Sequence, residues 1–167
     1  MTIRIGIITI SDRSARAERP DASGPALAKA VAKHDWQVIR TTVIPDEFEL
    51  IVATLTEWVD SGEIDIILTT GGTGFSPRDV TPEATAAVIH RLAPGLAEAM
   101  RTASLDITPH AMLSRAAAGI RARTLIINLP GSPKAAIENL AVVMPVLPHA
   151  VQLLREDPSA EAGHQAL

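Results

Sequence analysis

The apolar positions of the chain fall into two kinds of pattern that alternate along its length. Short, nearly continuous runs of β-branched residues are typical of strands that are buried on both faces. We expect such strands at residues 3–9, 36–44, 64–69, 118–121 and 124–129. Between them, apolar residues recur at helical spacing, or alanine-rich segments favour the helix. These segments predict helices at residues 25–34, 47–60, 81–91, 96–105, 109–113, 133–143 and 148–155.

Strands that alternate with helices predict an α/β fold. Right-handed crossovers would place helices on both faces of a mostly parallel sheet, giving a three-layer α/β/α sandwich. Residues 118–121 and 124–129 are joined by a tight turn at Ala122 and Arg123, so we expect one short antiparallel strand at the edge. The sandwich should span residues 1–155, and residues 156–167, which lack apolar periodicity, should form a flexible C-terminal tail.

Composition narrows the class of protein further. With 47% hydrophobic and 20% charged residues, the chain is typical of globular proteins. The chain has no cysteine, which excludes disulfides and thiolate metal sites, and no signal-peptide pattern precedes the first predicted strand, so we expect a cytoplasmic protein. The longest apolar runs, residues 5–10 and 124–129, are far shorter than the ~20 residues of a membrane span.

Charge and aromatic content make a small-molecule ligand the best expectation. The net charge is −4 and aromatic residues make up 2% of the chain, which argues against nucleic-acid binding. Polar or glycine-rich segments follow four of the predicted strands, and ligands of open α/β sheets bind beside the carboxyl ends of strands. The candidate residues in these segments are Ser11, Asp12, Asp46, Thr70, Gly71, Gly72, Thr73, Gly74, Asp79, Asn128, Pro130, Gly131 and Ser132.

The segment from residue 69 to 74, TTGGTG, has the chemistry of an anion cradle. Glycines allow the backbone to approach a phosphate, and successive amides and threonine hydroxyls supply donors. The segment lacks the lysine of a Walker A loop and the spacing of a dinucleotide-binding loop. Locally, it could equally be a turn that reverses the chain.

Two aspartates strengthen the interpretation of this edge as a phosphate site. Taken singly, Asp46 is an ordinary turn acid, and Asp79 is an acid favoured by the dipole of the helix that begins at Thr81. Together beside an anion cradle, they form the type of carboxylate pair that holds Mg²⁺ against substrate phosphates. The pair predicts phosphoryl or nucleotidyl transfer.

Several other residues have both a structural and a functional interpretation. Ser11 and Asp12 could supply a hydroxyl and a third ligand, or could cap the following loop. Ser132 should cap a helix whose N-terminal amides also form an anion site. Arg78 and Lys134 could neutralise phosphate or be solvated surface charges. The histidines show no metal-ligand spacing, and no serine has a hydrolase setting.

Taken together, the motifs identify a family. TTGGTGFSPRDVTPEAT (residues 69–85) occurs with SDR (11–13), PDE (45–47), LSR (113–115) and LPGSPKA (129–135). This set resembles the MogA/MoaB family of molybdenum-cofactor biosynthesis proteins, in the family's order and over residues 3–155. The resemblance implies the MogA-like molybdopterin-binding fold.

The resemblance also implies an activity. Members of the family's catalytic branch are ATP- and Mg²⁺-dependent molybdopterin adenylyltransferases, which transfer AMP from ATP to the terminal phosphate of molybdopterin and release pyrophosphate. By motif, Asp46 and Asp79 match the two essential aspartates, taken as catalytic and Mg²⁺-binding. Thr70 and the residues from Gly71 to Gly74 would contact phosphates, and the remaining candidates would line the nucleotide and pterin pocket: Ser11, Asp12, Asn128, Pro130, Gly131 and Ser132.

The resemblance leaves alternatives open. A MoaB-like protein would bind and deliver molybdopterin without turnover, and a weaker alternative is a nucleotide-binding regulator. Asp79 in the DVTPEAT form favours catalysis, whereas the PGSPKA segment also occurs in MoaB-like members. The expected partner is a MoeA-type molybdenum insertase, with no nucleic acid and no membrane. The expected assembly is a homotrimer, with a hexamer as the alternative of the MoaB branch.

Overall fold

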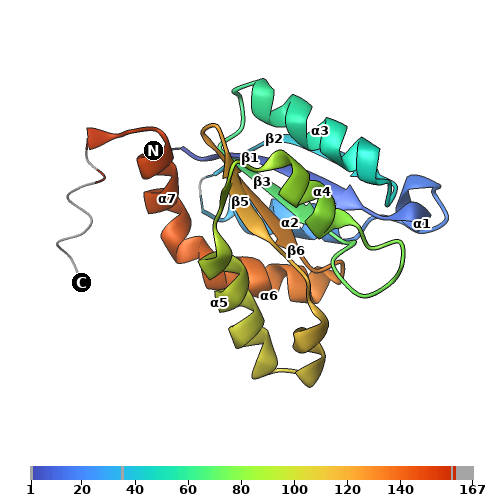
Figure 1. Ribbon diagram of the computed structural model, residues 1–167. Helices are drawn as coiled ribbons and strands as arrows, with labels where there is room; N and C mark the ends of the chain where they lie inside the picture. The colour runs from blue at the N-terminus through green and yellow to red at the C-terminus, as the bar shows by residue number, and fades with distance from the viewer. Residues whose placement is uncertain (1, 35, 159, 161–167) are drawn as a thin grey trace.

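A single six-stranded sheet forms the centre of the molecule (Figure 1). The computed structural model describes residues 2–34, 36–158 and 160. The strand order is β2-β1-β3-β6-β5-β4. The strand bounds are β1 Arg4–Ile10, β2 Gln37–Ile44, β3 Ile66–Thr70, β4 Arg91–Leu92, β5 Ala118–Arg121 and β6 Thr124–Leu129.

The sheet is mostly parallel, as expected. β2, β1, β3 and β6 run parallel, and β5 pairs antiparallel with both β6 and β4. The two-residue strand β4 was not expected, because residues 81–91 were predicted to be one helix. The helix instead ends at Val88, since Ile89 is extended (φ −72°, ψ 148°). The amide of His90 then donates to the Ile120 carbonyl at 2.8 Å, which extends the sheet beyond β5.

Helices cover both faces, which confirms the three-layer sandwich (Figure 1). Alternate strand residues point to opposite faces, so β1, β2, β3 and β6 contribute side chains to two cores. One core joins the sheet to α2, α5, α6 and α7, and the other joins it to α3 and α4. The bounds are α1 Asp12–Ala15, α2 Ser23–Ala32, α3 Phe48–Asp60, α4 Thr81–Val88, α5 Pro94–Leu105, α6 Pro133–Val143 and α7 Leu147–Leu154, with 3₁₀ turns at Pro109–Leu113 and Met144–Val146.

The helical stretch Pro133–Leu154 is long and apolar enough, by length and composition alone, to span a membrane. Uninterrupted apolar runs did not indicate this stretch, because polar residues are spread between its apolar ones. Leu140, Val143, Leu147 and Val151 from it are buried in the core against the sheet. One face of the stretch therefore packs on the sheet, and 33% of its most apolar window is buried.

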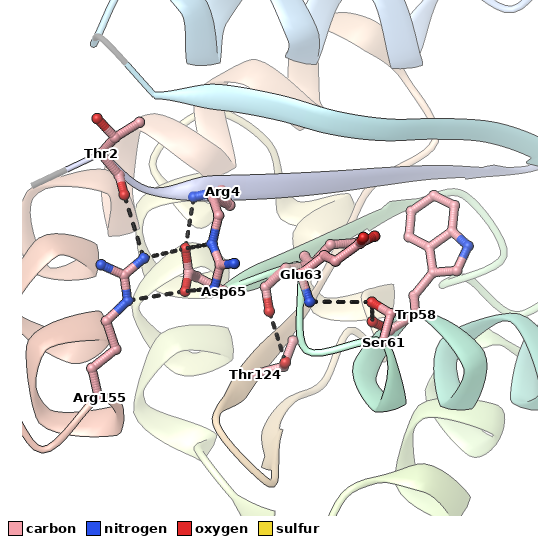
Figure 2. A network of polar contacts seen from close by, with 9 residues as sticks. Thr2, Arg4, Trp58, Ser61, Glu63, Asp65, Thr124 and Arg155 are labelled. Atoms are coloured by element: carbon pink, nitrogen blue, oxygen red, sulfur yellow. Dashed lines mark hydrogen bonds and ion pairs between the residues drawn. The ribbon is translucent and has the colours of Figure 1, made fainter.

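A buried carboxylate ties together the end of the sheet opposite the strands' carboxyl ends. Asp65 lies just before β3 and is 3% exposed. Arg4 donates to it from the backbone amide and the guanidinium, and Arg155 donates from the other side (Figure 2). Arg155 also donates to the Thr2 carbonyl at 3.3 Å. The network therefore fastens the N-terminal strand and the end of α7 to β3.

The predicted C-terminal tail is described in part. Glu156 pairs with Arg123 at 2.9 Å, and the amide of Ala160 donates to the Asp157 carbonyl at 2.9 Å. Ala160 is buried. Residues 159 and 161–167 of the predicted tail lie outside the described residues.

Candidate active site

A cavity of about 800 Å³ opens at the carboxyl ends of β1, β2, β3 and β6. This is the edge at which the sequence placed the candidate site. The predicted residues Ser11, Asp12, Asp46, Thr70, Gly71, Gly72, Asp79, Gly131 and Ser132 line it together with Thr9, Ile10, Arg13, Ser14, Arg16, Arg19, Pro20, Asp21, Ala22, Ser23, Ser76, Arg78 and Pro133. The structure therefore brings most of the candidates, from four separate loops, to one cavity.

Two glycines shape the floor of this cavity. Gly71 (φ +104°) and Gly72 (φ +63°) have positive φ values, which L side chains rarely adopt. A β-carbon at Gly71 would collide with the carbonyl of Ile10, so β1 and this loop approach each other too closely for a side chain. Thr81 holds the pair in place, because its hydroxyl donates to the Gly71 carbonyl at 2.9 Å and its amide to the Gly72 carbonyl at 3.1 Å.

The order Thr81-Pro82-Glu83 is typical of a helix start with the threonine as N-cap, but the structure places Thr81 differently. The helix includes Thr81, and the cap position belongs to Val80, which offers no side-chain cap. The hydroxyl of Thr81 is fully buried and serves the glycine loop. The same side chain that looked like a helix signal thus shapes the floor of the site.

Asp46 is held at the end of β2 by the loop that follows β1. Asp46 Oδ2 accepts a hydrogen bond from the amide of Asp12 at 2.8 Å. Its other oxygen, Oδ1, lies 2.9 Å from the position that a β-carbon on Gly72 would take. Burial raises the pKa of Asp46, and the negative charges of Asp12 and Asp79 raise it further, despite the hydrogen bond from Asp12. An added cation would relieve this crowding of negative charge.

Asp79 approaches the glycine loop from its other end. Asp79 Oδ2 accepts a hydrogen bond from the amide of Ser76 at 2.9 Å, and it lies 2.9 Å from the position of a β-carbon on Gly74. Asp46 and Asp79 both line the same cavity. They are also close enough for the charge of Asp79 to affect the pKa of Asp46.

Asp12, which is bonded to Asp46, forms an ion pair with Arg78. Arg78 donates to both carboxylate oxygens of Asp12, from Nε and from Nη2, at 2.9 Å each. The hydrogen bond from Arg78 lowers the pKa of Asp12 and outweighs the opposing effect of burial. Arg78 is exposed and lines the cavity, but its guanidinium is already paired. To bind a phosphate it would have to share or leave Asp12.

Other predicted residues have structural contacts. Ser11 is the N-cap of α1, a short helix that the sequence did not predict, and its hydroxyl accepts from the Ser14 amide at 3.3 Å. Thr70 Oγ1 donates to the Pro130 carbonyl at 2.6 Å and joins the loops after β3 and β6. Ser132 occupies the cap position of α6 without a side-chain cap bond, contrary to prediction, and it lines the cavity instead.

Asn128 and Lys134 lie outside the main cavity. Asn128 is fully buried, and its amide group donates to the hydroxyls of Thr69 and Thr85 at 2.9 Å each. The predicted contact between Asn128 and a ligand is therefore replaced by a link between β6, β3 and α4. Lys134 is exposed and pairs with Glu138 at 3.8 Å.

A second cavity, of about 290 Å³, lies beside the first. The segments after β3 and β6 line both cavities, since Thr73, Gly74 and Pro130 contribute to the second. Its other lining residues are Arg101, Ser104, Ile107, Thr108, His110, Ala111, Leu113, Ser114, Ala135, Glu138 and Asn139. Ile107, Ala111 and Leu113 supply apolar surface beside the polar groups of Arg101 and Asn139.

The sequence analysis missed a group of arginines. Arg13, Arg16 and Arg19 line the main cavity from the loop after β1. Arg16 pairs with Glu18 at 2.8 Å, and Arg19 donates to the Ser11 hydroxyl at 3.4 Å. The sequence did indicate them, because three arginines lie in the segment after the first predicted strand, at the edge where an anion was expected. The arginines add positive charge to the part of the cavity wall formed by the loop after β1, which Asp12 and Asp21 also line.

Among the described residues, no group of three or more His, Cys, Asp or Glu side chains could hold a metal ion. The described residues therefore contain no metal site that protein side chains form by themselves. Mg²⁺, however, usually takes one or two carboxylates and completes its coordination with water and substrate phosphates. Asp46 and Asp79 fit that requirement.

Comparison with known proteins gives consistent results. Residues 6–149 match the family model described as "Probable molybdopterin binding domain". The chain is 41% identical to the molybdopterin adenylyltransferase of Helicobacter pylori (strain J99 / ATCC 700824), over 92% of this chain and 88% of that protein. It is 46% identical to gephyrin of Dictyostelium discoideum over 93% of this chain, but it spans about a quarter of that protein's length (23%). The crystal structure of MoaB from Thermus thermophilus superposes with a TM-score of 0.88 at 49% identity, covering 94% of this chain and 99% of that one.

Proposed function

This chain belongs to the molybdopterin-binding domain family, and from that premise we propose that it is a molybdopterin adenylyltransferase that acts in molybdenum-cofactor biosynthesis. The observation that carries the proposal is the convergence of Asp46 and Asp79 on one cavity whose floor is the Gly71-Gly72 turn. Relatives named molybdopterin adenylyltransferase, 39–41% identical over nearly their full length, support it.

The proposed reaction requires little from the protein in acid–base chemistry. An oxygen of the terminal phosphate of molybdopterin attacks the α-phosphorus of ATP, a new P–O bond forms, and the bond to the β-phosphate breaks to release pyrophosphate. The nucleophile is already an anion, so no strong base is needed. The site has to align two phosphate groups that repel each other and to neutralise their charge.

The main cavity supplies the groups for this task. Asp46 and Asp79 would hold a Mg²⁺ ion, which when bound supplies positive charge beside the phosphates. The glycine turn allows the backbone to approach the phosphates closely. Arg13, Arg16 and Arg19, which line the same cavity, would neutralise the charge of the triphosphate. The cavity is large enough for a nucleotide, since ligand pockets typically measure ~300–1,000 Å³.

The second cavity is the proposed pterin site. Its size and its apolar walls with few polar groups suit a flat, polar-edged ring system. Because the segments after β3 and β6 line both cavities, ligands in the two would meet at the Gly72–Thr73 and Pro130–Gly131 peptides. A phosphate attached to the pterin would then reach the nucleotide at the glycine loop.

The competing function is that of a carrier that binds molybdopterin without turnover. The sequence resemblance places such carriers in the MoaB branch, and a MoaB structure is 49% identical to this chain. A carrier needs the cavities but not a pair of carboxylates whose charges crowd each other. Two carboxylates that line one cavity would repel an anionic ligand unless a cation lay between them, and this arrangement favours the enzyme.

The deciding experiment is to incubate purified protein with molybdopterin, ATP and Mg²⁺ and to analyse the products by mass spectrometry. The enzyme is expected to give adenylylated molybdopterin and one equivalent of pyrophosphate. Omission of ATP or addition of a chelator is expected to abolish both products. Tight pterin binding with no pyrophosphate in the complete mixture would establish the carrier instead.

The proposed function also carries an expected oligomeric state and an expected recipient of the product. We expect a homotrimer, with a hexamer as the alternative, and Phe75, Leu92, Ile107 and Met112 supply exposed apolar surface that an assembly could bury. Light scattering on the purified protein distinguishes these states.

An adenylylated pterin is an activated intermediate, so a MoeA-type insertase in the cytoplasm is the expected recipient. Co-purification of the two proteins tests this.

A further inference from the structure

Arg115 belongs to the LSR motif, which the proposed function leaves without a role. It lies between the 3₁₀ turn Pro109–Leu113 and β5, and it reaches the loop that carries Asp79. Its backbone amide donates to the Thr73 carbonyl at 2.9 Å. Its guanidinium donates from Nε to the Gly74 carbonyl at 2.7 Å and from Nη2 to the Asp79 carbonyl at 2.6 Å. Arg115 thus contacts both ends of the loop.

We propose that Arg115 is a positioning residue of the adenylyl-transfer site, which fixes residues 73–79 so that the carboxylate of Asp79 faces the cavity. The inference rests on the proposed function for its effect on catalysis. Its structural part, the ordering of this loop by Arg115, stands on the contacts alone.

The loop needs an external support. Residues 71–80 form no helix or strand, and residues 75–78 are exposed to solvent. Two bonds link Ser76 and Asp79 within it: the Asp79 amide donates to the Ser76 carbonyl, and the Ser76 amide donates to Asp79 Oδ2, both at 2.9 Å. An exposed segment with so few internal bonds opens readily. The side chain of Arg78 is paired with Asp12 outside the loop, and Arg115 adds three bonds to the backbone carbonyls of the loop.

The planar guanidinium suits this task. Its donors form a rigid fork, so one side chain fixes the Gly74 and Asp79 carbonyls relative to each other. A trans peptide places its N–H opposite its C=O. Because the carbonyls of Gly74 and Asp79 face Arg115, the amides of Phe75 and Val80 in the same peptides are turned away from it. A lysine carries the same charge but has no fork, and it could not fix two carbonyls in one plane.

Arg115 is itself held in position by its surroundings. Arg101 donates to the carbonyls of Ser114 and Ala116, at 3.1 and 3.3 Å, on either side of Arg115. Glu83 in α4 forms an ion pair with the guanidinium and balances its charge. Arg115 is not among the residues that line the main cavity. Its contacts therefore favour an action through the loop over a direct contact with phosphate.

The test compares Arg115→Lys with Arg121→Lys. Arg121 is a matched control, because it also bonds a backbone carbonyl (Val88, 3.3 Å) and a carboxylate (Asp60, 3.4 Å), but away from both cavities. We expect both variants to lose a few degrees of melting temperature at most. Arg115→Lys is expected to lower kcat by ~10- to 100-fold with a smaller change in KM, because misplacement of a catalytic group affects the transition state most. Arg121→Lys is expected to keep its kcat.

Amide hydrogen exchange separates this inference from the proposed function. In Arg115→Lys, peptides that cover residues 73–80 are expected to exchange faster, while the rest of the chain keeps its protection. This measurement needs no turnover, so it judges the ordering of the loop even if the wild-type protein shows no adenylyl transfer. Unchanged exchange in the loop, or unchanged kcat in an active enzyme, would overturn the proposal.

A second variant tests whether the planar guanidinium group, and not only its charge, is required. Arg115→Ala is expected to regain part of its kcat when guanidinium chloride is added at millimolar concentration, since the small cation can occupy the vacated position. Methylammonium chloride at the same concentration is the control and is expected to give no recovery. Equal recovery with both salts would show that charge alone matters and would contradict the positioning role.

Discussion

Asp46 and Asp12 fasten the ends of β2 and β1 to each other by a reciprocal pair of hydrogen bonds. Asp46 Oδ2 accepts from the Asp12 amide at 2.8 Å, and Asp12 Oδ1 accepts from the Asp46 amide at 3.1 Å. Each side chain thus orients the other's backbone. The arrangement fixes the carboxylate of Asp46 beside Gly72 before any ligand binds, so its contribution to the site is preorganised.

Asp46→Asn is expected to separate the two roles of this side chain. The asparagine carbonyl can still accept the Asp12 amide, so the loop and the melting temperature should be kept. The negative charge is lost, so ATP binding should lose its dependence on Mg²⁺. Titration calorimetry with ATP, with and without Mg²⁺, measures this. The same Mg²⁺ dependence in variant and wild type would contradict a metal-binding role for Asp46.

Asp79→Asn is expected to fold normally, because its oxygen can still accept the Ser76 amide. Adenylyl transfer should fall by at least ~100-fold, a typical effect of losing a preorganised charge contact. Molybdopterin affinity should be unchanged, since the second cavity does not include Asp79. Pyrophosphate release with molybdopterin supplied gives the rate. Full turnover in this variant would remove Asp79 from the mechanism.

Most of the fold could be predicted because local patterns agree with it. The buried runs of β1, β3 and β6 and the amphipathic spacing of α3 are properties of short segments. The predictions were wrong where contacts with distant parts of the chain determine the local structure. β4 forms because the edge of β5 offers carbonyls to residues after Val88, and no property of residues 89–92 alone indicates that partner.

The candidate site shows the same division. Residues next to glycines or strand ends were found because their position in the parallel sheet follows from topology. The roles of Asn128 and Thr81 could not be predicted, since their partners are 10 to 59 residues away in the chain. Arg115 donates to Gly74, 41 residues earlier, and the LSR motif by itself gave no indication of that contact.

Gly72→Ala tests the shape of the glycine turn. A β-carbon there would collide with Thr81 Oγ1 and lie 2.9 Å from Asp46 Oδ1, in a backbone with φ +63°. We expect loss of both activity and stability, with a destabilisation of ~1 kcal/mol or more from the positive φ alone. Gly95→Ala in α5 is the matched control, because nothing lies within 4 Å of its β-carbon position. Thermal unfolding should show the control equal to or more stable than wild type.

Asp65 provides a pH-dependent part of the stability, at the opposite end of the sheet from the site (Figure 2). Burial alone would raise the pKa of Asp65, but hydrogen bonds from Arg4 and Arg155 outweigh it and hold the pKa below its usual 3.8. Because the folded pKa is lowered, the ionised carboxylate stabilises the fold above the unfolded pKa. This stabilisation is lost as the pH falls through the folded pKa.

Asp65→Asn is therefore expected to lower the free energy of unfolding by about 3 kcal/mol at neutral pH, because it leaves two arginines without their buried partner. The difference from wild type should stay constant above about pH 5 and shrink below about pH 4, where the carboxylate of the unfolded wild-type chain takes up a proton before that of the folded protein does. Urea unfolding of both proteins across this range measures it, and the subtraction removes the titration of the other carboxylates. Asp60→Asn, at an exposed pair with Arg121, should change stability by less than ~1 kcal/mol at every pH. A difference for Asp65→Asn that grew toward acid pH would mean that its folded pKa is raised, and the two arginines would then not be its dominant partners.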